Sequence, residues 1–515
     1  MNKKLVYAAF GITIISSTGK ILGLIRESSF AAYFGASSNT DAFKIAFSIP
    51  DIFIAIFSAA IAQVFIPVYC DILKEGNPDK TQRFLNNIFT LIAIASATIV
   101  LLGIILRGPL VDLIAPGFDE ASKRSAMEMV IIMFPGALFM IMANLVSGYL
   151  QVHERFISSS LIWYSYNICI ISSLVLFHKF GIKVAAVGAL FGLIGMLLIQ
   201  LPSLVWQGFR YRPVIDFKDD GFRMISMLIL PVLISSAFNQ VYNVINRMLA
   251  SNLGQGSISA LDYAGRVSIL INTVFIVSIA TVIYPSLAKQ SDCIPQFNAT
   301  LASSTRLASM ISFPLATILL ILRKPIIQVL FERGAFSALD TKMTAGVLGF
   351  LSIAVIGITH REFLNRAFFA LKDTRTPMIN GIIAIGLNII LNLILVQCMG
   401  INGLALGTSI ASLLSAYMLL IRLYRKQESI SKSLISEGFI KSFIAAAIMG
   451  LVVFIGEKLL LNIMHLDGNT LLRLVNIMLA CCIGGVVYIG FLAILKVHEI
   501  REGFYLVRKK LREAF

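Results

Sequence analysis

The chain alternates between long apolar stretches and short polar connections along its whole length. A stretch of about 20 apolar residues is long enough for one α-helix to cross a bilayer. The candidate spans number fourteen, and they lie at 8–34, 41–68, 86–106, 127–150, 157–178, 184–206, 224–248, 259–287, 307–331, 343–370, 376–398, 401–424, 438–461 and 470–496. The pattern predicts an all-α polytopic membrane protein with about 14 transmembrane helices.

Similar segments recur along the chain and predict an internal repeat. The segment AAYFGASSNTDAF at 31–43 matches ASNLGQGSISALDY at 250–263, and GIKVAAVGAL from Gly181 matches GINGLALGTS from Gly400. The offset between matching segments is near 219 residues, which corresponds to six spans. Because six is an even number, the two halves have the same orientation in the membrane, as the parallel repeats of some transporters do.

The repeat divides the chain into three parts. We predict an N-lobe at 1–210 with spans 1–6 and a C-lobe at 211–430 with spans 7–12. Spans 13 and 14 have no counterpart, and they lie with a basic cytoplasmic tail at 431–515. The tail after Val497 alternates apolar and basic residues, which fits either a short interfacial helix or a solvated charged segment.

Composition excludes a soluble protein, because 57% of the 515 residues are hydrophobic and only 14% are charged. The formal net charge of +16 does not indicate a nucleic-acid partner. Most Lys and Arg residues fall in connections on one side of the predicted membrane, and the positive-inside rule assigns that side to the cytoplasm. Lys3 and Lys4 at the start, together with an even number of spans, predict that both termini are cytoplasmic.

Charged residues inside the predicted spans are the strongest candidates for function. An ionised side chain near the bilayer centre costs about 2.5–3.5 kcal/mol, so it usually faces a bundle interior or a wet cavity. The in-span cations are Lys20, Arg26, Lys44, Arg247, Arg266, Arg361 and Arg366, and the in-span carboxylates are Glu27, Asp41, Asp51, Asp262 and Glu362. The excess of cations predicts a positive interior, which suits an anionic cargo, and Arg binds phosphate well through its bidentate fork.

The sequence suggests a different role for each of these charged residues, either in a cavity or in the structure alone. We assign Lys20, Arg26 and Arg266 to the wall of a cavity, with Glu27 orienting the neighbouring cations. Asp41 is either a binding residue or the N-cap of the second helix. The other charges have purely structural alternatives, which are a snorkelling Lys44, an ion pair of Arg361 with Glu362, and a snorkelling Arg366.

A polar set in spans 7, 11 and 12 is a weak candidate for a sodium site. Asn246, Asn388, Asn392 and Thr408 offer oxygen atoms, but the set has no carboxylate, so interhelical hydrogen bonding is favoured. No GxxxxGK[ST] loop occurs, and the five histidines are scattered. We therefore expect neither an enzyme nor a cofactor.

Three segments resemble one transporter family. The runs GKILGLIRESSFAAYFGASSNTDAF, YAGRVSILINTVF followed by YPSLAK, and NRAFFALKDTRTP are similar to the MurJ (MviN) family of lipid II flippases, within the multidrug/oligosaccharidyl-lipid/polysaccharide exporter superfamily. The resemblance covers essentially the whole chain. It implies two six-helix lobes around a cationic cavity, a groove for the polyprenyl tail at the last two helices, and alternating-access transport of lipid II to the outer leaflet for cell-wall synthesis.

The family's functional positions can be followed along this sequence. The resemblance implies that its basic residue of the first helix is Lys20, followed by Arg26 and Glu27, that its second-helix acid is Asp41, and that its eighth-helix arginine is Arg266. A second-helix arginine of the family is replaced by Ile54, which Arg247 or Lys44 compensates in one interpretation. A nearby acid is replaced by Ala59.

These departures keep a second cargo open, another polyprenyl-diphosphate glycan such as an O-antigen, teichuronic or exopolysaccharide precursor. A drug antiporter is disfavoured, because cationic drugs require carboxylates in the cavity. We further expect a location in the bacterial inner membrane, transport coupled to the membrane potential or a monovalent cation, and contacts with other cell-wall synthesis proteins.

Overall fold

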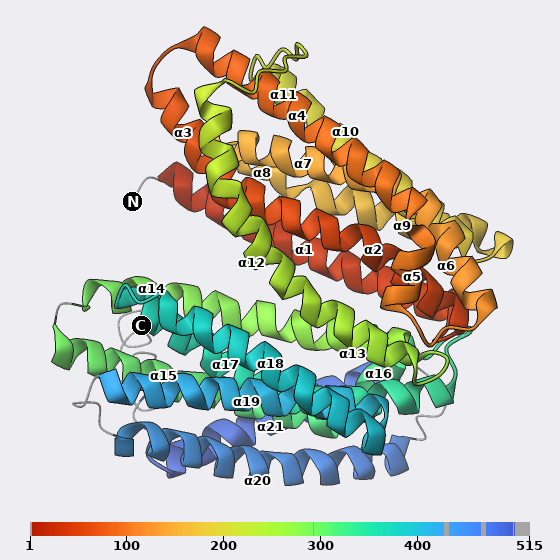
Figure 1. Cartoon of the computed structure of the whole chain (residues 1–515). Helices are drawn as coiled ribbons and strands as arrows, with labels where there is room; N and C mark the ends of the chain where they lie inside the picture. The colour runs from red at the N-terminus through yellow and green to blue at the C-terminus, as the bar shows by residue number, and fades with distance from the viewer. Residues whose placement is uncertain (1–2, 292, 427–431, 465–469, 498, 500–515) are drawn as a thin grey trace. The chain divides into compact units, whose positions relative to one another are not determined.

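A computed structural model describes residues 3–291, 293–426, 432–464, 470–497 and 499 (Figure 1). All regular secondary structure among these residues is helical, and η1 and η3 are π-helical while η2 is a 3₁₀ helix. The elements are α1 (Lys3–Phe34), α2 (Ser38–Ala60), η1 (Ile61–Phe65), α3 (Ile66–Lys74), α4 (Pro78–Ile105), α5 (Arg107–Ile114), α6 (Glu120–Met133), α7 (Pro135–Val152), α8 (Phe156–Ser160), α9 (Ile162–Phe177), η2 (His178–Phe180), α10 (Lys183–Leu198), α11 (Leu201–Trp206), α12 (Asp220–Ser251), α13 (Ser257–Ile271), η3 (Asn272–Val277), α14 (Ser278–Lys289), α15 (Ile294–Ile321), α16 (Arg323–Phe331), α17 (Ala338–Ala370), α18 (Arg375–Met399), α19 (Ile401–Lys426), α20 (Lys432–Met464) and α21 (Thr470–Ile494).

The helices confirm the predicted fold class. Twelve helical segments of the described chain are long and apolar enough to cross a membrane. The predicted first span coincides with α1 and the eighth with the run α13–η3–α14, but neither is among the twelve. The count of fourteen therefore stays a prediction. The tail beyond residue 499, where a short interfacial helix or a solvated segment is expected, lies outside the described residues.

Two compact units divide the structure. Unit 1 comprises Met1–Ser259 with Gly334–Phe336, and unit 2 comprises Ala260–Arg333 with Ser337–Phe515. Helix α12, which carries the predicted seventh span, packs against α2 within unit 1. The lobe boundaries at 210 and 430 stay predictions.

The backbone carries conformational landmarks at matching positions of the predicted repeat. Residues with positive φ occur in three pairs at an offset of 218 or 219 residues, and these pairs are Gly35 with Gly254, Glu154 with Lys372, and Gly181 with Gly400. Positive φ is unfavourable for residues with a side chain, so it marks turns that the fold requires. The pairs therefore show that equivalent connections in the two lobes follow the same local path.

The helices α4 and α15 repeat a second local structure. Each has 28 residues and is followed by one leucine, Leu106 or Leu322, with φ −88° and ψ 11° or 15°. The next residue is an arginine in both cases, and its Nη1 donates to the carbonyl three residues earlier, at 2.9 Å for Arg107 and 3.0 Å for Arg323. The same break of the helix thus occurs in both halves of the predicted repeat.

Small residues allow the helices that support the first helix to approach closely. In unit 1, α10 packs against α9 through Gly188 and Gly192. A Cβ atom at Gly192 would lie 2.9 Å from Cα of Tyr166, and one at Gly188 would lie 2.2 Å from Oγ of Ser173. The GxxxG spacing thus fixes α9, which in turn packs against α1.

In unit 2 the last two helices form a shared core with α15. Phe313 of α15 is buried in one apolar cluster with Met449 and Val453 of α20 and Ala480 of α21. Tyr488 of α21 also donates its hydroxyl to the carbonyl of Met310 at 3.0 Å. Spans 13 and 14 are thus packed on the helical bundle of unit 2 rather than standing apart from it.

Candidate functional site

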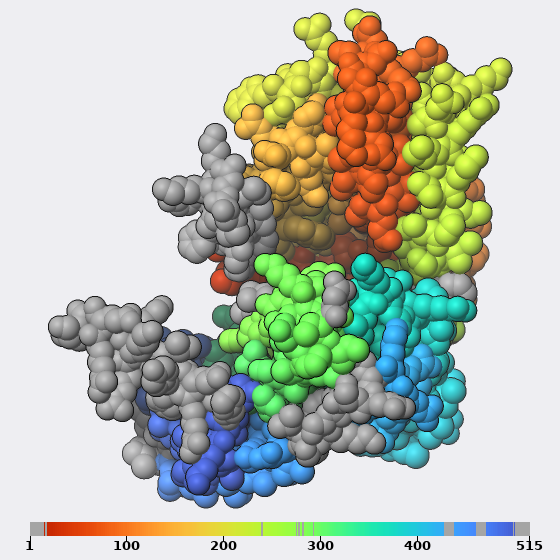
Figure 2. Space-filling model, turned by 90° about the vertical axis from the view of Figure 1, so that its left-hand side faces the viewer, coloured from red at the N-terminus to blue at the C-terminus, as the bar shows by residue number. Residues whose placement is uncertain are grey.

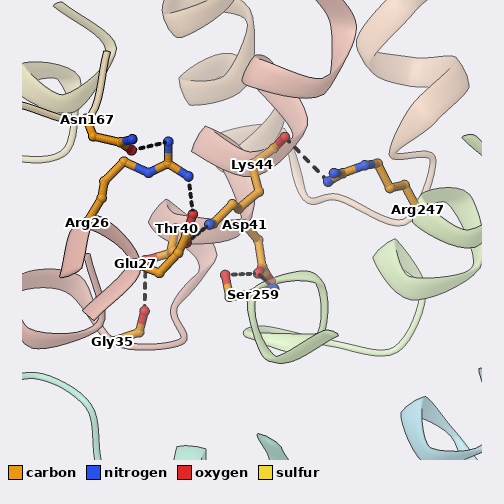
Figure 3. A network of polar contacts seen from close by, with 9 residues as sticks. All are labelled: Arg26, Glu27, Gly35, Thr40, Asp41, Lys44, Asn167, Arg247 and Ser259. Carbon is orange, nitrogen blue, oxygen red and sulfur yellow. Dashed lines mark hydrogen bonds and ion pairs between the residues drawn. The ribbon is translucent and has the colours of Figure 1, made fainter. Parts of the chain in front are cut away.

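The turn between α1 and α2 brings charged residues of both helices together. Gly35 ends the first helix with φ 63°, and the side chain of Ser37 caps α2 by accepting from the Thr40 N–H. The Thr40 hydroxyl donates back to the carbonyl of Gly35 at 3.0 Å. This tight connection places Arg26 and Glu27, two turns before the end of α1, beside Lys44 on α2 (Figure 3).

Glu27 pairs with two cations at once. Its Oε1 accepts from Nη2 of Arg26 at 2.6 Å, and its Oε2 accepts from Nζ of Lys44. Arg26, Glu27 and Lys44 are only 8%, 1% and 6% exposed. We call these three residues the buried ion network. Its formal charge is +1, because one carboxylate is shared by two cations.

Helix α9 holds the guanidinium of Arg26 from a third direction. Nη1 of Arg26 donates to Oδ1 of Asn167 at 3.1 Å, and its Cζ lies 5.0 Å from the centre of the Tyr166 ring. Asn167 is itself fixed by donating to the carbonyl of Trp163 at 2.8 Å. These partners hold Arg26 in one orientation, which is the preorganisation that recognition of an anion requires.

Lys44 differs from its predicted snorkelling alternative. Its ammonium group is buried against Glu27 and lies 5.5 Å from the centre of the Phe30 ring. The expectation that it extends to the outer interface is wrong. A neighbouring buried carboxylate binds the ammonium, which makes extension toward the membrane surface unnecessary.

Asp41 bonds to a distant segment instead of capping its own helix. Its carboxylate accepts from the N–H groups of Gly256 and Ser259 at 2.7 Å each, and from the Ser259 hydroxyl at 2.5 Å (Figure 3). The N-cap alternative for α2 is wrong, since Ser37 holds that position. Asp41 instead satisfies backbone donors at the start of α13, where a negative charge is favourable. Its assignment to substrate binding stays a prediction.

The remaining predicted cations have different surroundings. Arg247 of α12 is half-buried, and its Nη1 donates to the carbonyl of Lys44 at 3.5 Å, so it borders the buried ion network. Lys20 is exposed on α1, and Arg266 is exposed on α13 in unit 2. The meeting of Lys20, Arg26 and Arg266 in one chamber stays a prediction.

In the tenth predicted span, Arg366 pairs with Glu362 at 2.9 Å instead of snorkelling.

The sodium candidates of α18 and α19 bond to one another. Nδ2 of Asn388 donates to the Thr408 hydroxyl at 3.2 Å, and Nδ2 of Asn392 donates to Oδ1 of Asn388 at 2.9 Å. The bond from Asn388 to Thr408 is an interhelical hydrogen bond of the kind that the sequence favours, whereas the bond from Asn392 to Asn388 lies within α18. Asn246 lies in unit 1, so the four-residue sodium site stays a prediction. No group of three His, Cys, Asp or Glu side chains that could bind a metal occurs within the described part of the chain.

Several of these partners were not predicted from the sequence. Sequence reasoning identified Arg26, Glu27 and Lys44, but it did not pair Lys44 with Glu27 or find Asn167 and Tyr166. The one available signal was the polar Asn167 within an apolar span, four residues after Trp163.

Comparison with known proteins gives consistent matches over most of the chain. A family model described as "Lipid II flippase MurJ" matches residues 30–470. The probable lipid II flippase MurJ of Buchnera aphidicola subsp. Acyrthosiphon pisum is 29% identical over 495 residues, which are 94% of this chain and 96% of the relative. The lipid II flippase MurJ of Burkholderia cenocepacia is 28% identical over 432 residues, which are 81% of this chain and 82% of the relative.

Solved structures give the same result. A lipid II flippase MurJ in an inward closed conformation has a TM-score of 0.80 and 27% identity, and the match covers 94% of this chain and 98% of that one. An inward-facing multidrug resistance MATE family transporter of the MOP superfamily has a TM-score of 0.65 and 14% identity, covering 82% and 99% of the two chains. The second match shows a shared fold alone.

Proposed function

This chain belongs to the MurJ family of lipid II flippases, and we propose on that premise that cations on its membrane-spanning helices bind the diphosphate of lipid II. It is a lipid II flippase and a multi-pass protein of the bacterial inner membrane, and its cargo is a lipid-linked glycan. The residues that bind the cargo, the energy source and the orientation of the termini are the parts that we propose here.

One observation carries the proposal: two buried cations, one on α1 and one on α2, share one carboxylate. The three residues of the buried ion network carry a formal charge of +1. This positive charge supports attraction of an anionic group, because electrostatic interactions are stronger in a poorly hydrated site than in bulk water. Lys20 on α1 and Arg266 on α13 complete the proposed seat for the diphosphate.

Glu27 has a supporting role in this proposal. It holds Arg26 and Lys44 close together, while Asn167 and Tyr166 fix the guanidinium plane. A fixed guanidinium can offer two parallel N–H donors to phosphate oxygens at a low entropic cost. Asp41 keeps the start of α13 against α2, and Arg247 adds positive charge at the border of the network.

Transport in this proposal needs no chemical step, and so no enzymatic activity. Alternating access of the two lobes carries the sugar–peptide headgroup through a hydrated cavity while the polyprenyl tail stays in lipid. Moving a headgroup of net charge −2 outward gains about 4–5 kcal/mol per 100 mV when the cytoplasm is negative. We therefore propose that the membrane potential contributes. Unchanged flipping after collapse of the potential with valinomycin and potassium would refute this contribution.

The test of the binding site is a leaflet-accessibility assay for lipid II in proteoliposomes. Arg26→Ala removes a charge-assisted phosphate contact worth about 1.5–3 kcal/mol, so flipping should fall about 10- to 100-fold. Lys183→Gln is the matched control, because it removes an exposed cation whose pair with Glu128 lies on a surface. Full flipping by Arg26→Ala at normal protein levels would contradict the proposal.

The alternative cargo has one structural observation behind it. Ile54 is buried, so the position where the family has an arginine carries no charge in this protein. The relatives from Buchnera aphidicola and Burkholderia cenocepacia and the solved MurJ structure all carry the name lipid II flippase, and we therefore favour lipid II. Rescue of a cell depleted of its own lipid II flippase supports this cargo, whereas failure with normal membrane insertion supports another polyprenyl-diphosphate glycan.

The orientation of the chain and its partners complete the proposal. Cytoplasmic termini follow from the positive-inside rule, and labelling of a cysteine placed at either terminus from the outside only would contradict them. Contacts with other cell-wall synthesis proteins are part of the proposed cellular role.

A further inference from the structure

The connection between α11 and α12 is an extended segment that lies along α4 (Figure 1). We call residues 207–219 the linker. It joins the span that ends at Trp206 to the span that begins at Asp220, and it belongs wholly to unit 1. Its position between two span ends places it at the interface between the apolar core and the headgroups of a bilayer.

Polar side chains of α4 bind the main chain of the linker. The Asn87 amide makes two bonds to Asp216, accepting from its N–H at 2.9 Å and donating to its carbonyl at 2.7 Å. Oδ1 of Asn86 accepts from the N–H of Arg212 at 3.1 Å, and the Thr90 hydroxyl accepts from the N–H of Val214 at 3.3 Å. Asn87 is 0% exposed, so its amide is buried where it binds Asp216.

The bonded positions 212, 214 and 216 alternate with the positions between them, as in an extended strand. Val214 and Asp216 are half-buried, whereas Tyr211, Ile215 and Phe217 are exposed. The exposed fraction reaches 64% at Phe217 and 84% at Trp206. The main chain is thus held on α4 while the large apolar side chains of Ile215 and Phe217 are exposed. The ring of Tyr211 is also exposed, and its hydroxyl lies 3.1 Å from the Thr90 hydroxyl of α4.

Basic residues accompany the exposed aromatic ones. Arg210, Arg212 and Lys218 are all exposed, and within the described residues none of them forms an ion pair with a carboxylate. The only acid between them, Asp216, is paired with Arg83 at 2.9 Å. Figure 2 shows yellow-green surface, which includes α12, on either side of the orange surface of α4.

We infer that the linker is a binding surface for anionic phospholipid headgroups, independent of the cargo and of the buried ion network. The exposed rings insert at the level of the headgroups, as aromatic residues at span ends do. Arg210, Arg212 and Lys218 then lie at the height of the phosphates. The hydrogen bonds from Asn86, Asn87 and Thr90 fix the main chain that carries the aromatic and the basic side chains. Lipid binding therefore does not have to order this main chain.

The test uses Trp206 as a reporter, because the chain contains only two tryptophans, Trp163 and Trp206. In the Trp163→Phe background, Trp206 fluorescence is measured in vesicles of phosphatidylglycerol and phosphatidylcholine, with bromine on one lipid or the other. A cation near an anionic surface contributes about fivefold to binding, so the brominated anionic lipid should quench several-fold better at equal mole fraction.

Two changes should remove this preference. The first is a triple variant, Arg210→Gln with Arg212→Gln and Lys218→Gln, which should bring the two quenching efficiencies close to equality. The second is a tenfold increase in the salt concentration with the linker unchanged, which should have the same effect because salt screens the charges. The matched control is Arg124→Gln, Lys179→Gln and Lys342→Gln, which removes three exposed cations at helix ends on the predicted outer side and should leave the preference unchanged.

Equal quenching by both lipids without any substitution would overturn the inference, because it would indicate apolar contact without headgroup recognition. Absence of quenching by either lipid would also overturn it, because it would mean that protein covers Trp206. If the triple linker variant does not fold, the salt dependence of quenching in the protein without linker substitutions still tests the inference. None of these readouts measures transport, so the result is independent of the proposed diphosphate site.

Discussion

After its first span, each half of the predicted repeat makes a turn at a glycine with positive φ, Gly35 in the predicted N-lobe and Gly254 in the predicted C-lobe. A serine begins the next helix at aligned positions, Ser38 and Ser257. The spans that follow also contain a π-helical stretch in both lobes, although not at the same aligned residues. The local path of the backbone is thus shared by the two lobes.

The side chains placed on this shared backbone differ. The positions of Arg26, Glu27 and Lys44 correspond at an offset of 219 to Ile245, Asn246 and Tyr263. The buried ion network therefore has no charged equivalent at the matching C-lobe positions. Since the C-lobe forms the same turn without these charges, the fold does not require them. The asymmetry supports a role of the network in function.

At a second pair of matching positions, both halves of the repeat form a side-chain bridge, but from different residue types. In the C-lobe, Nζ of Lys426 donates to Oδ2 of Asp373 at 2.7 Å and links the connection after α17 to the end of α19. The matching N-lobe residues are Arg155 and Gln207. The Gln207 amide, assigned with its oxygen toward the guanidinium, accepts from Nε of Arg155 at 2.6 Å. A bridge between these positions thus recurs in both halves of the predicted repeat, as an ion pair in one and as a bond to a neutral amide in the other.

The largest effect on stability is expected for Glu27→Gln. This variant tests whether the carboxylate of Glu27 stabilises the two cations of the buried ion network. Removing the shared carboxylate takes an ion-pair partner from two buried cations and should lower the free energy of unfolding by about 3–5 kcal/mol. Thermal unfolding in detergent measures the loss. The double variant Glu27→Gln with Lys44→Met leaves Arg26 as the one cation, which returns the formal charge of the three positions to +1. It should recover much of the lost stability.

The matched C-lobe control is Glu362→Gln, which removes the half-buried partner of Arg366 and should cost less than about 1 kcal/mol. Equal losses for Glu27→Gln and Glu362→Gln would mean that the two lobes do not differ in their charge balance.

The next effect concerns Asp41, whose aligned C-lobe residue is Ala260. Asp41→Ala leaves the N–H groups of Gly256 and Ser259 without their acceptor and should cost about 2–4 kcal/mol, because charge-assisted hydrogen bonds are lost in a buried place. The neighbouring exposed Asn39→Ala should be nearly neutral in the same unfolding assay. A neutral result for Asp41→Ala would show that its three contacts do not stabilise the start of α13.

Substitution of the paired glycines should have similar effects in both lobes. Gly35→Ala and Gly254→Ala each force a residue with a Cβ atom into positive φ, at a cost of about 1–2 kcal/mol. Unfolding temperatures of the two variants provide the comparison. A large loss in one lobe and none in the other would contradict the shared turn.

The smallest effect is expected at the bridge between Asp373 and Lys426, and it depends on pH. The hydrogen bond from Lys426 and the bonds from Thr376 lower the pKa of Asp373 to about 2. Between that value and its usual pKa the unfolded chain binds more protons, so the bridge stabilises fully above about pH 4 and is lost as the pH falls through about 2.

At pH 7 Asp373→Asn should cost about 1 kcal/mol, since Lys426 is half-exposed and solvent screens the pair. The matching N-lobe variant Arg155→Gln should show no pH dependence between pH 3 and 5. A stability difference for Asp373→Asn that grows as the pH falls would contradict this account.

The sequence alone determined the helical membrane fold, the repeat and the charges worth attention. Apolar span length, the turn glycines and the in-span position of Arg26 and Glu27 are local properties, which can be recognised without knowing which helices are neighbours. The family signature from Gly19 to Phe43 is likewise a continuous run of residues.

Only the tertiary structure decided the partners of these residues. Lys44 binds Glu27 across 17 residues of chain, Arg26 binds Asn167 across 141, and Asp41 binds Ser259 across 218. The linker follows the same rule, because α4 supplies its hydrogen-bond partners from more than 120 residues earlier. A charge inside an apolar span must find compensation, but which helix supplies it depends on the faces that pack together, and that information is not contained in any one segment.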